Sequence, residues 1–218
     1  MILLETKNIS YKYGKGDMIF NNLSLSFEAG KVYALLGASG VGKTTLLSLL
    51  AGLDCCIDGT ILYNGSDLKK MNRNLYRAKD VGMVFQQFNL LHRFNAVENV
   101  LIAMEVSKYK VTNPKKYAEE LLDNIGIDEK KRRRKVIELS GGEQQRVAIV
   151  RAISHKPSII LADEPTGSLD EVNQTGIIKD LVKFARSDDR CVIISTHSNE
   201  VAKSADEVIT MYPCQDFV

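Results

Sequence analysis

The chain has 218 residues, 26% of them charged, and a formal net charge of only +2. This length suits one globular unit with a subdomain. The charged residues are balanced in sign, which argues against a disordered chain and against a protein that binds polyanions over a broad surface. The longest near-apolar stretch, around residues 46–53, is too short to cross a bilayer, and the N-terminus lacks the pattern of a secretory leader. The four cysteines lack paired metal-ligand spacing, so we expect reduced thiols in a cytoplasmic protein.

The first third of the chain contains strands and a phosphate-binding pattern. Leu3–Ile9 and Leu23–Phe27 are rich in β-forming residues, and the apolar run Val32–Leu36 suits a buried parallel strand. Thr45–Ala51 then reads as a helix. The intervening Gly37–Thr44 fits the pattern G-x-x-x-x-G-K-[ST], in the strand–loop–helix context that this pattern requires.

The chemistry of this loop points to a nucleotide. Its glycines let backbone N–H groups turn toward anionic oxygens, and the N-terminus of the next helix adds partial positive charge there. Lys43 supplies a full charge for the β- and γ-phosphates, and the Thr44 hydroxyl can ligate Mg²⁺. A glycine-rich turn without a ligand would leave the Lys-Thr pair at this spacing unexplained. The loop therefore predicts a nucleotide and Mg²⁺.

The middle of the chain changes character. An apolar strand, Val81–Phe85, is followed by Gln86, which alone reads as an ordinary polar loop residue. From about residue 88 to residue 155 the sequence is helix-rich, with apolar residues at three- and four-residue spacing in Ala96–Val106 and Lys115–Ile125.

The segment Leu139–Arg146 reads Leu-Ser-Gly-Gly-Glu-Gln-Gln-Arg and leads into a helical pattern at Gln144–Ser154. Ser140 and Glu143 fit a capping box, which satisfies free N–H groups in the first helical turn. A cap does not explain two glycines in that turn, because each costs helix stability of roughly 1 kcal/mol. Glycine there makes sense if a phosphate of another molecule approaches the backbone. We therefore predict an anion site and a cap together.

After Pro157 the chain alternates between strands and helices, which implies a parallel, doubly wound sheet. The first of these strands ends in Asp163 and Glu164, whose side chains should point in different directions and so serve different functions. A strand end followed by a polar turn is the simpler explanation for this acidic pair when it is taken in isolation. The expected elements are Ser158–Ala162 (strand), Glu171–Arg186 (helix), Cys191–Ser195 (strand), Asn199–Ser204 (helix) and Glu207–Met211 (strand).

The phosphate loop and Leu139–Arg146, in this order, resemble the cassette ATPases of ABC transporters, and the resemblance covers nearly the whole chain. It implies an α/β fold: a three-layer P-loop NTPase core with a mainly parallel sheet, a small N-terminal antiparallel β subdomain and an inserted helical subdomain. Within a single ABC ATPase domain over residues 1–218, residues 1–87 and 156–218 would form the nucleotide-binding core with the β subdomain. Residues 88–155 would form the helical subdomain with the Ser-Gly-Gly segment.

The resemblance also implies catalytic roles. Glu164 would orient and polarise the attacking water, His197 would contact the γ-phosphate, and Gln86 would reach Mg²⁺ and that water. Asp163 would hold Mg²⁺ through water, together with Thr44 and Gln86. A lone histidine after a strand is more often a structural residue, so His197 depends on the family order for its role.

The nucleotide-binding residues implied by the resemblance come from two copies of the chain. Tyr13, rather than the competing Tyr11, would stack on adenine. Ser168–Asp170 matches the loop that crosses the interface between copies. The full set is Tyr13, Gly37, Ser39, Gly40, Val41, Gly42, Lys43, Thr44 and Thr45 from one copy, and Ser140, Gly141 and Gly142 from the other.

Two short segments, Phe85–Leu91 and Val97–Val100, resemble the branch that serves lipoprotein-releasing, macrolide-exporting and antimicrobial-peptide-resistance systems. The resemblance implies a homodimer that closes on ATP and powers export or extraction through a separate transmembrane permease, at the cytoplasmic face of the membrane. The chain departs from the family pattern twice. Lys130–Ile137 lacks the usual proline, and Tyr212–Val218 lacks the usual turn and final strands.

Other functions remain as alternatives. Six consecutive basic residues, Lys130–Lys135, can mark a nucleic-acid or anionic-membrane contact, although a solvated helix face or loop is the simpler explanation. ABC-type ATPases that act on nucleic acid usually carry two cassettes, a coiled coil or extra domains, so no nucleic-acid partner is expected. A regulatory GTPase is weaker still, because no Asn-Lys-x-Asp guanine reader appears. An ATPase that signals through its membrane partner without transport stays open.

Overall fold

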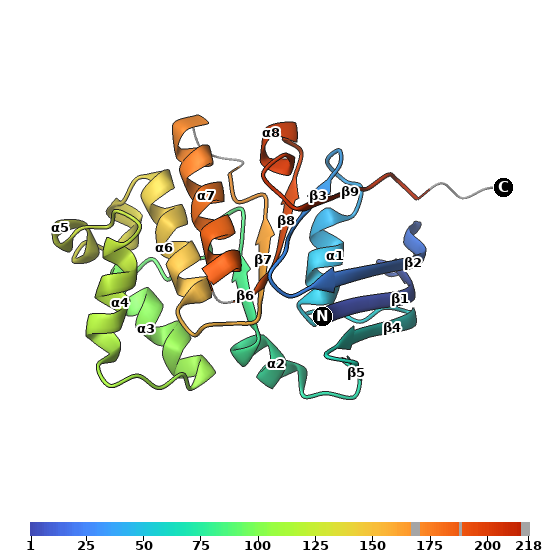
Figure 1. Cartoon of the computed structure of the whole chain (residues 1–218), viewed down its shortest axis with the longest axis horizontal. Helices are drawn as coiled ribbons and strands as arrows, with labels where there is room; N and C mark the ends of the chain where they lie inside the picture. The colour runs from blue at the N-terminus through green and yellow to red at the C-terminus, as the bar shows by residue number, and fades with distance from the viewer. Residues whose placement is uncertain (167–170, 188, 215–218) are drawn as a thin grey trace.

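The chain folds into two β-sheets and a set of helices (Figure 1). The computed structural model describes residues 1–166, 171–187 and 189–214. The strands are β1 (Ile2–Lys12), β2 (Met18–Glu28), β3 (Val32–Leu36), β4 (Asp58–Tyr63), β5 (Ser66–Asp67), β6 (Val81–Val84), β7 (Ile159–Asp163), β8 (Cys191–Thr196) and β9 (Glu207–Thr210). The helices are α1 (Lys43–Leu50), α2 (Arg73–Lys79), α3 (Ala96–Ser107), α4 (Pro114–Asp123), α5 (Glu129–Arg132), α6 (Gly141–Ile153), α7 (Glu171–Ser187) and α8 (Asn199–Ala202), with a 3₁₀ turn at Val136–Glu138.

The two sheets differ in type. An antiparallel sheet has the strand order β2-β1-β4-β5, and a parallel sheet has the order β6-β7-β8-β3-β9. In the parallel sheet, the carboxyl ends of β3, β7 and β8 lie side by side, which places the loops after these strands at one edge. The expected fold class, a mainly parallel α/β core with an antiparallel subdomain and inserted helices, is confirmed.

The strands β3, β7 and β8 contain long apolar runs because both faces of the sheet are covered there. In β8, Cys191 and Ile193 belong to one buried cluster, while Val192 and Ile194 belong to another. The first cluster includes four buried leucines of α1 and apolar side chains of β1 and β2. The second includes apolar side chains of α6, α7 and α8. Figure 1 shows α6 and α7 on the side of the parallel sheet opposite α1. The sheet is therefore the middle layer of three.

A third apolar cluster lies within the helix-rich segment and joins α3, α4 and α6. Asn99 of α3 is fully buried, and its side chain binds the backbone of the segment that follows β6. Its Oδ1 accepts the N–H of Leu91, and its Nδ2 donates to the carbonyls of Leu91 and Asn95. Residues 91–95 are thereby fixed to the first turn of α3.

Several elements differ from the sequence-based expectations. The helix expected to begin at Gln144 begins at Gly141, because the capping box of Ser140 and Glu143 starts it three residues earlier. The elements β4, β5, α2 and α5 were not predicted. β5, α2 and α5 are short, partly exposed and rich in polar residues, and β4 begins with an exposed aspartate and a glycine. Within the part of the chain that the structure describes, no helix is both long and apolar enough for a membrane span.

Close packing at Gly82 of β6 generates a stability prediction. A Cβ at this position would lie 2.3 Å from the carbonyl oxygen of Ala152 and 3.0 Å from Cγ of Pro157, so the backbone would have to move. We expect Gly82→Ala to lower the free energy of unfolding by about 2 kcal/mol, measured by chemical denaturation. Gly176→Ala is the control, because Gly176 lies in α7 with open space at its Cβ position. It should leave stability unchanged or raise it by up to about 1 kcal/mol. Equal losses in the two variants would contradict the packing argument.

Candidate functional site

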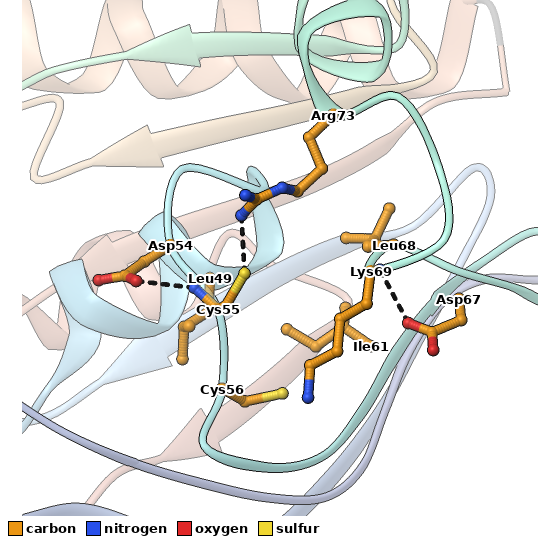
Figure 2. Close-up of a pocket in the computed structure, with 9 residues that line it drawn as sticks. All are labelled: Leu49, Asp54, Cys55, Cys56, Ile61, Asp67, Leu68, Lys69 and Arg73. Carbon is orange, nitrogen blue, oxygen red and sulfur yellow. Dashed lines mark hydrogen bonds between the residues drawn. The ribbon is translucent and has the colours of Figure 1, made fainter.

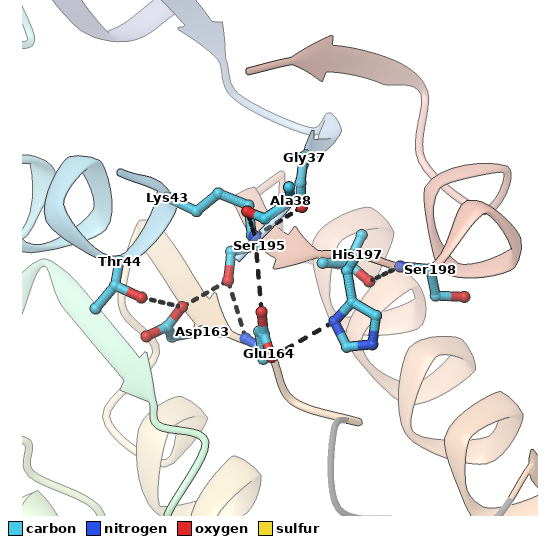
Figure 3. A network of polar contacts seen from close by, with 10 residues as sticks. Gly37, Ala38, Lys43, Thr44, Asp163, Glu164, Ser195, His197 and Ser198 are labelled. Atoms are coloured by element: carbon cyan, nitrogen blue, oxygen red, sulfur yellow. Dashed lines mark hydrogen bonds and ion pairs between the residues drawn. The ribbon is translucent and has the colours of Figure 1, made fainter. Parts of the chain in front are cut away.

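Three loops from different strands meet at the carboxyl edge of the parallel sheet (Figure 3). Lys43 and Thr44 begin α1 directly after the loop that follows β3, Asp163 ends β7 with Glu164 as the next residue, and His197 directly follows β8. Because parallel strands direct their carboxyl ends to the same edge, residues far apart in the chain come within hydrogen-bond distance here.

The loop between β3 and α1 has the backbone that a phosphate cradle needs. Gly40 and Gly42 have φ values of 86° and 98°, in the left-handed region that side chains disfavour. A Cβ at Gly42 would lie 2.6 Å from Cγ2 of Ile19, whereas the Cβ position at Gly40 is open. The loop thus packs tightly against β2 at Gly42, whereas Gly40 is open. An anion could approach the N–H groups of the loop on this open side.

Lys43 is a buried cation at the first position of α1, with 5% of its surface exposed. Its Nζ donates to the carbonyl oxygens of Gly37 at 2.8 Å and Ala38 at 2.9 Å, and it lies 3.7 Å from Oε1 of Glu164. A buried ammonium group is stable only when it is paired and hydrogen-bonded. These contacts hold the charge at the mouth of the loop.

Asp163 faces the phosphate loop on the other side. Its Oδ1 accepts hydrogen bonds from the hydroxyls of Thr44, at 3.0 Å, and Ser195, at 2.6 Å. A hydroxyl and a carboxylate in contact form a set of oxygen donors that suits Mg²⁺. Mg²⁺ keeps several waters and takes phosphate oxygens beside one or two protein ligands, and a pair such as this leaves those positions open.

Glu164 occupies a different environment from Asp163. Its φ is 42°, in the left-handed region, and its side chain lies between Lys43 and His197. Nδ1 of His197 is 3.5 Å from Oε2 of Glu164, and the imidazole is largely exposed. The two carboxylates therefore face different partners, as expected. The physical reason differs from the expected strand alternation, because Glu164 lies one residue beyond β7, in a left-handed turn.

Of the two tyrosines considered for base stacking, Tyr11 is buried, and its hydroxyl donates to Asp54. Tyr13 is 56% exposed, its ring meets that of Tyr11 edge-on at 5.1 Å, and its hydroxyl lies 3.2 Å from Oγ1 of Thr45. Only Tyr13 of these two offers an exposed ring beside α1.

A small pocket lies under the loop after α1 (Figure 2). Asp54, the partner of Tyr11, also accepts the N–H of Cys55, and Sγ of Cys55 accepts from Nη1 of Arg73 at 2.8 Å.

All four cysteines are free thiols. Burial raises the pKa of the Cys191 thiol to about 12, so that thiol stays protonated.

The Ser-Gly-Gly segment starts α6. Oγ of Ser140 accepts the N–H of Glu143, and Oε2 of Glu143 accepts the N–H of Ser140 at 2.9 Å. This capping box is formed as predicted, and the Ser140 N–H holds the pKa of Glu143 below its usual range. Ser140 and Gly141 are exposed and Gly142 is buried. Within the described residues, no hydrogen bond or ion pair joins this segment to the phosphate loop of the same chain.

The basic run at 130–135 is partly neutralised by its neighbours. Lys131 lies 3.7 Å from Asp128 and 3.2 Å from Glu143. Arg132 pairs with Asp123, and Arg133 pairs with Glu129. Half of the run is thus engaged within the helical segment, which weakens the interpretation of the run as a polyanion-binding surface.

The remaining residues to compare with the sequence-based expectations are Gln86, Ser168–Asp170 and Ser195. Gln86 is exposed and follows β6, at the same edge of the sheet. Ser168–Asp170 lies outside the described residues. Ser195 was expected only as the end of a strand. Its signal in the sequence was a hydroxyl that directly follows the apolar run Cys191–Ile194.

Comparisons with known proteins agree with this geometry. Residues 20–167 match the family model described as ABC transporter. The chain is 43% identical over 207 residues to the ABC transporter ATP-binding protein YclH of Bacillus subtilis, covering 94% of this chain and 92% of that protein. It is 34% identical to the lipoprotein-releasing system ATP-binding protein LolD of Anaplasma marginale, covering 96% and 95%.

A solved dimeric ATP-binding cassette in a post-hydrolysis state, bound to ADP and Pi, superposes with a TM-score of 0.87 at 32% identity, covering 96% of this chain and 94% of that one. The phosphate loop, the acidic strand end and the capped Ser-Gly-Gly helix thus occur together in a fold shared with these cassettes. The chain belongs to the ABC transporter family, as one of its ATP-binding, ATP-hydrolysing cassettes.

Proposed function

We propose that this cassette is a Mg²⁺-dependent ATPase subunit that dimerises on ATP and drives a separate membrane permease from the cytoplasmic face. The observation that carries the proposal is the meeting of Lys43, Thr44, Asp163 and Glu164 at one edge of the parallel sheet. Relatives named for lipoprotein release and for macrolide export, LolD and MacB, support transport over signalling without transport.

The contacts in the structure support the roles that we propose for the residues around the phosphates. Lys43 is proposed to exchange its bonds to the loop carbonyls for the β- and γ-phosphates. Thr44 and Asp163, with Gln86 from the next loop, are the proposed Mg²⁺ ligands, Asp163 through water. Bound Mg²⁺ would neutralise phosphate charge and polarise the terminal phosphoryl group. The remaining residues of the loop would surround the phosphates: Gly37, Ser39, Gly40, Val41, Gly42 and Thr45.

Glu164 is proposed to orient and polarise the attacking water. It now pairs with Lys43, so transfer of that cation to the phosphates would free one carboxylate oxygen. His197 lies at the outer end of the same carboxylate and is proposed to contact the γ-phosphate. Tyr13 is proposed to stack on adenine, because its ring is exposed beside α1.

The second half of each site is proposed to come from another copy of the chain. Ser140 and Gly141 are exposed at the N-terminus of α6, which is thirteen residues long and so presents free N–H groups and a helix dipole. Together with Gly142 they would contact the phosphates held by the partner. Two solved cassettes of the same fold are described as dimeric, which supports this arrangement.

The permease is proposed to dock where the segment after Gln86 meets the helices. Within that segment Leu90 is buried, while Leu91 and Phe94 are 43% and 41% exposed. Beside it a groove is lined by residues of β6, α3 and α6, including Ala103 and Arg151, and by Phe85, Asn89 and His155 from the adjoining loops. A short cytoplasmic helix fits such a groove.

Motion of the helical subdomain would transmit closure to the permease. We propose that residues 88–155 form this subdomain and move relative to residues 1–87 and 156–218. Arg151 of α6 donates to the carbonyls of Phe88 and Asn89, so the segment after Gln86 is attached to the same helix that carries the Ser-Gly-Gly cap. Dimer closure at the cap would therefore move the docking segment as well.

The first functional prediction concerns Glu164. We expect Glu164→Gln to lower the turnover number by about 10²-fold or more while ATP binding survives, because the amide keeps the shape but loses the acceptor charge. Phosphate release and binding of a fluorescent ATP analogue measure the two quantities. Glu120→Gln, an exposed change in α4, is the control and should keep normal turnover. Near-normal turnover in Glu164→Gln would remove this residue from the catalytic role.

The second prediction concerns assembly. Because each site needs Lys43 from one copy and Ser140 from the other, Glu164→Gln with ATP should elute from gel filtration as a two-fold dimer. The nucleotide-free protein should elute mostly as a monomer. Adding Ser140→Arg to Glu164→Gln should abolish the dimer while ATP still binds, since the bulky cation occupies the shared surface. A dimer that survives Ser140→Arg, or an ATP-loaded protein that remains monomeric, contradicts the shared site.

The third prediction tests docking. Arg93→Glu and Phe94→Glu change exposed side chains in the segment after Gln86 and should abolish co-purification with the permease. The ATPase activity of the isolated chain should stay within a few fold. Val208→Glu is the matched control, because Val208 is exposed on β9 at the opposite edge of the parallel sheet. If docking survives the first two changes but is lost when the run at 130–135 is neutralised, the contact is the basic run instead.

A further inference from the structure

A serine hydroxyl inside the parallel sheet joins the two carboxylate residues of the site. Ser195 is the fifth residue of β8, is fully buried, and pairs in register with Asp163 of β7. Its Oγ donates to Oδ1 of Asp163 at 2.6 Å and accepts the N–H of Glu164 at 2.9 Å. Figure 3 shows the hydroxyl between the two residues. One side chain therefore contacts both members of the acidic pair.

The backbone of Glu164 explains why such a contact matters. Its φ of 42° lies in the left-handed region, which a residue with a Cβ adopts only when its surroundings impose it. The Glu164 N–H has two acceptors, and both belong to Ser195: the hydroxyl, and the carbonyl oxygen at 3.2 Å. The unusual turn that directs Glu164 toward Lys43 and His197 is thus held from β8.

The other partner of Asp163 cannot replace this bond. The hydroxyl of Thr44 also reaches Oδ1 of Asp163, but Thr44 is itself a proposed ligand of the cation. Ser195 is buried behind the strand ends, so its hydroxyl remains available to Asp163 when the site is loaded. Its single O–H donates to Asp163, and one of its two lone pairs accepts the N–H of Glu164.

We propose that Ser195 is a positioning residue for ATP hydrolysis, which fixes the carboxylate of Asp163 and the backbone of Glu164 in one geometry. This inference rests on the proposed roles of Asp163 and Glu164. Ser195 touches neither nucleotide nor water in this scheme. Its effect reaches the reaction through the water-polarising carboxylate, so it should change the turnover number more than the apparent affinity for ATP.

Another buried serine provides a matched control. Ser154 is equally buried, at the end of α6, and its Oγ donates to the backbone carbonyl of Arg151 within that helix. Ser154→Ala removes the same hydroxyl from the same depth without touching the acidic pair. Ser195→Thr keeps the hydroxyl and suits a β-strand position.

The kinetic experiment compares these variants in the full chain. Ser195→Ala should lower the turnover number about tenfold, which corresponds to the loss of one ordinary hydrogen bond in the transition state, while the KM for ATP changes less than about twofold. Ser154→Ala should keep both parameters, and Ser195→Thr should restore most of the turnover. Thermal unfolding establishes that each variant is folded. Normal turnover in Ser195→Ala, or a parallel loss in Ser154→Ala, overturns the proposal.

A second readout does not depend on activity. In the nucleotide-free protein, the backbone amide of Glu164 should exchange with deuterium faster in Ser195→Ala than in the wild type, and at the wild-type rate in Ser154→Ala. Unchanged exchange in Ser195→Ala overturns the positioning role. The outcome is separable from that of Glu164→Gln: if Glu164→Gln turns over normally, the catalytic assignment fails, whereas a normal Ser195→Ala beside an inactive Glu164→Gln removes only Ser195.

Discussion

The ammonium group of Lys43, buried at the carboxyl edge of a parallel sheet, sets the conditions for the rest of the site. A cation in this position requires oxygen atoms around it, and the loop supplies two carbonyls while Glu164 supplies a carboxylate. Between these carbonyls and Lys43, the loop backbone enters the left-handed region at Gly40 and Gly42, which glycine adopts without strain. The carboxylate can reach it only because β7 pairs with β8, and β8 pairs with β3. The loop conformation, the strand order and the acidic pair thus together place oxygen atoms around the buried ammonium group of Lys43.

In the helical part of the molecule, α6 connects the Ser-Gly-Gly cap to the segment that follows β6. α6 begins at the Ser-Gly-Gly cap, packs on the parallel sheet through Ile149 and Ile153, and binds the segment after β6 through Arg151. Asn99 fixes the far end of that segment to α3. The cap and the segment after β6 are therefore attached to shared helices, and neither can shift without its neighbours.

The elements that could be predicted from the sequence are those whose residue types are dictated by burial on both faces or by the chemistry of a ligand. The strands β3, β7 and β8 are covered on two faces, so they read as uninterrupted apolar runs, and the phosphate loop has a spacing set by its chemistry. Neither β4 nor α2 was predicted, because β4 begins at an exposed aspartate followed by Gly59, and α2 buries only Tyr76. The left-handed turn at Glu164 and the contacts of Ser195 were not predicted either. Both depend on the register between β7 and β8, which no local pattern encodes.

The ion pair between Lys131 and Glu143 connects the basic run at 130–135 to the N-terminus of α6. Glu143 closes the cap of α6, and Lys131 belongs to the basic run that precedes it. At least one positive charge of that run therefore helps to stabilise a helix terminus of the same chain. The number of basic residues in the run reflects this structural role as well as any attraction to an outside partner. In a comparison among cassettes, a change of sign at either residue should be accompanied by a compensating change at the other.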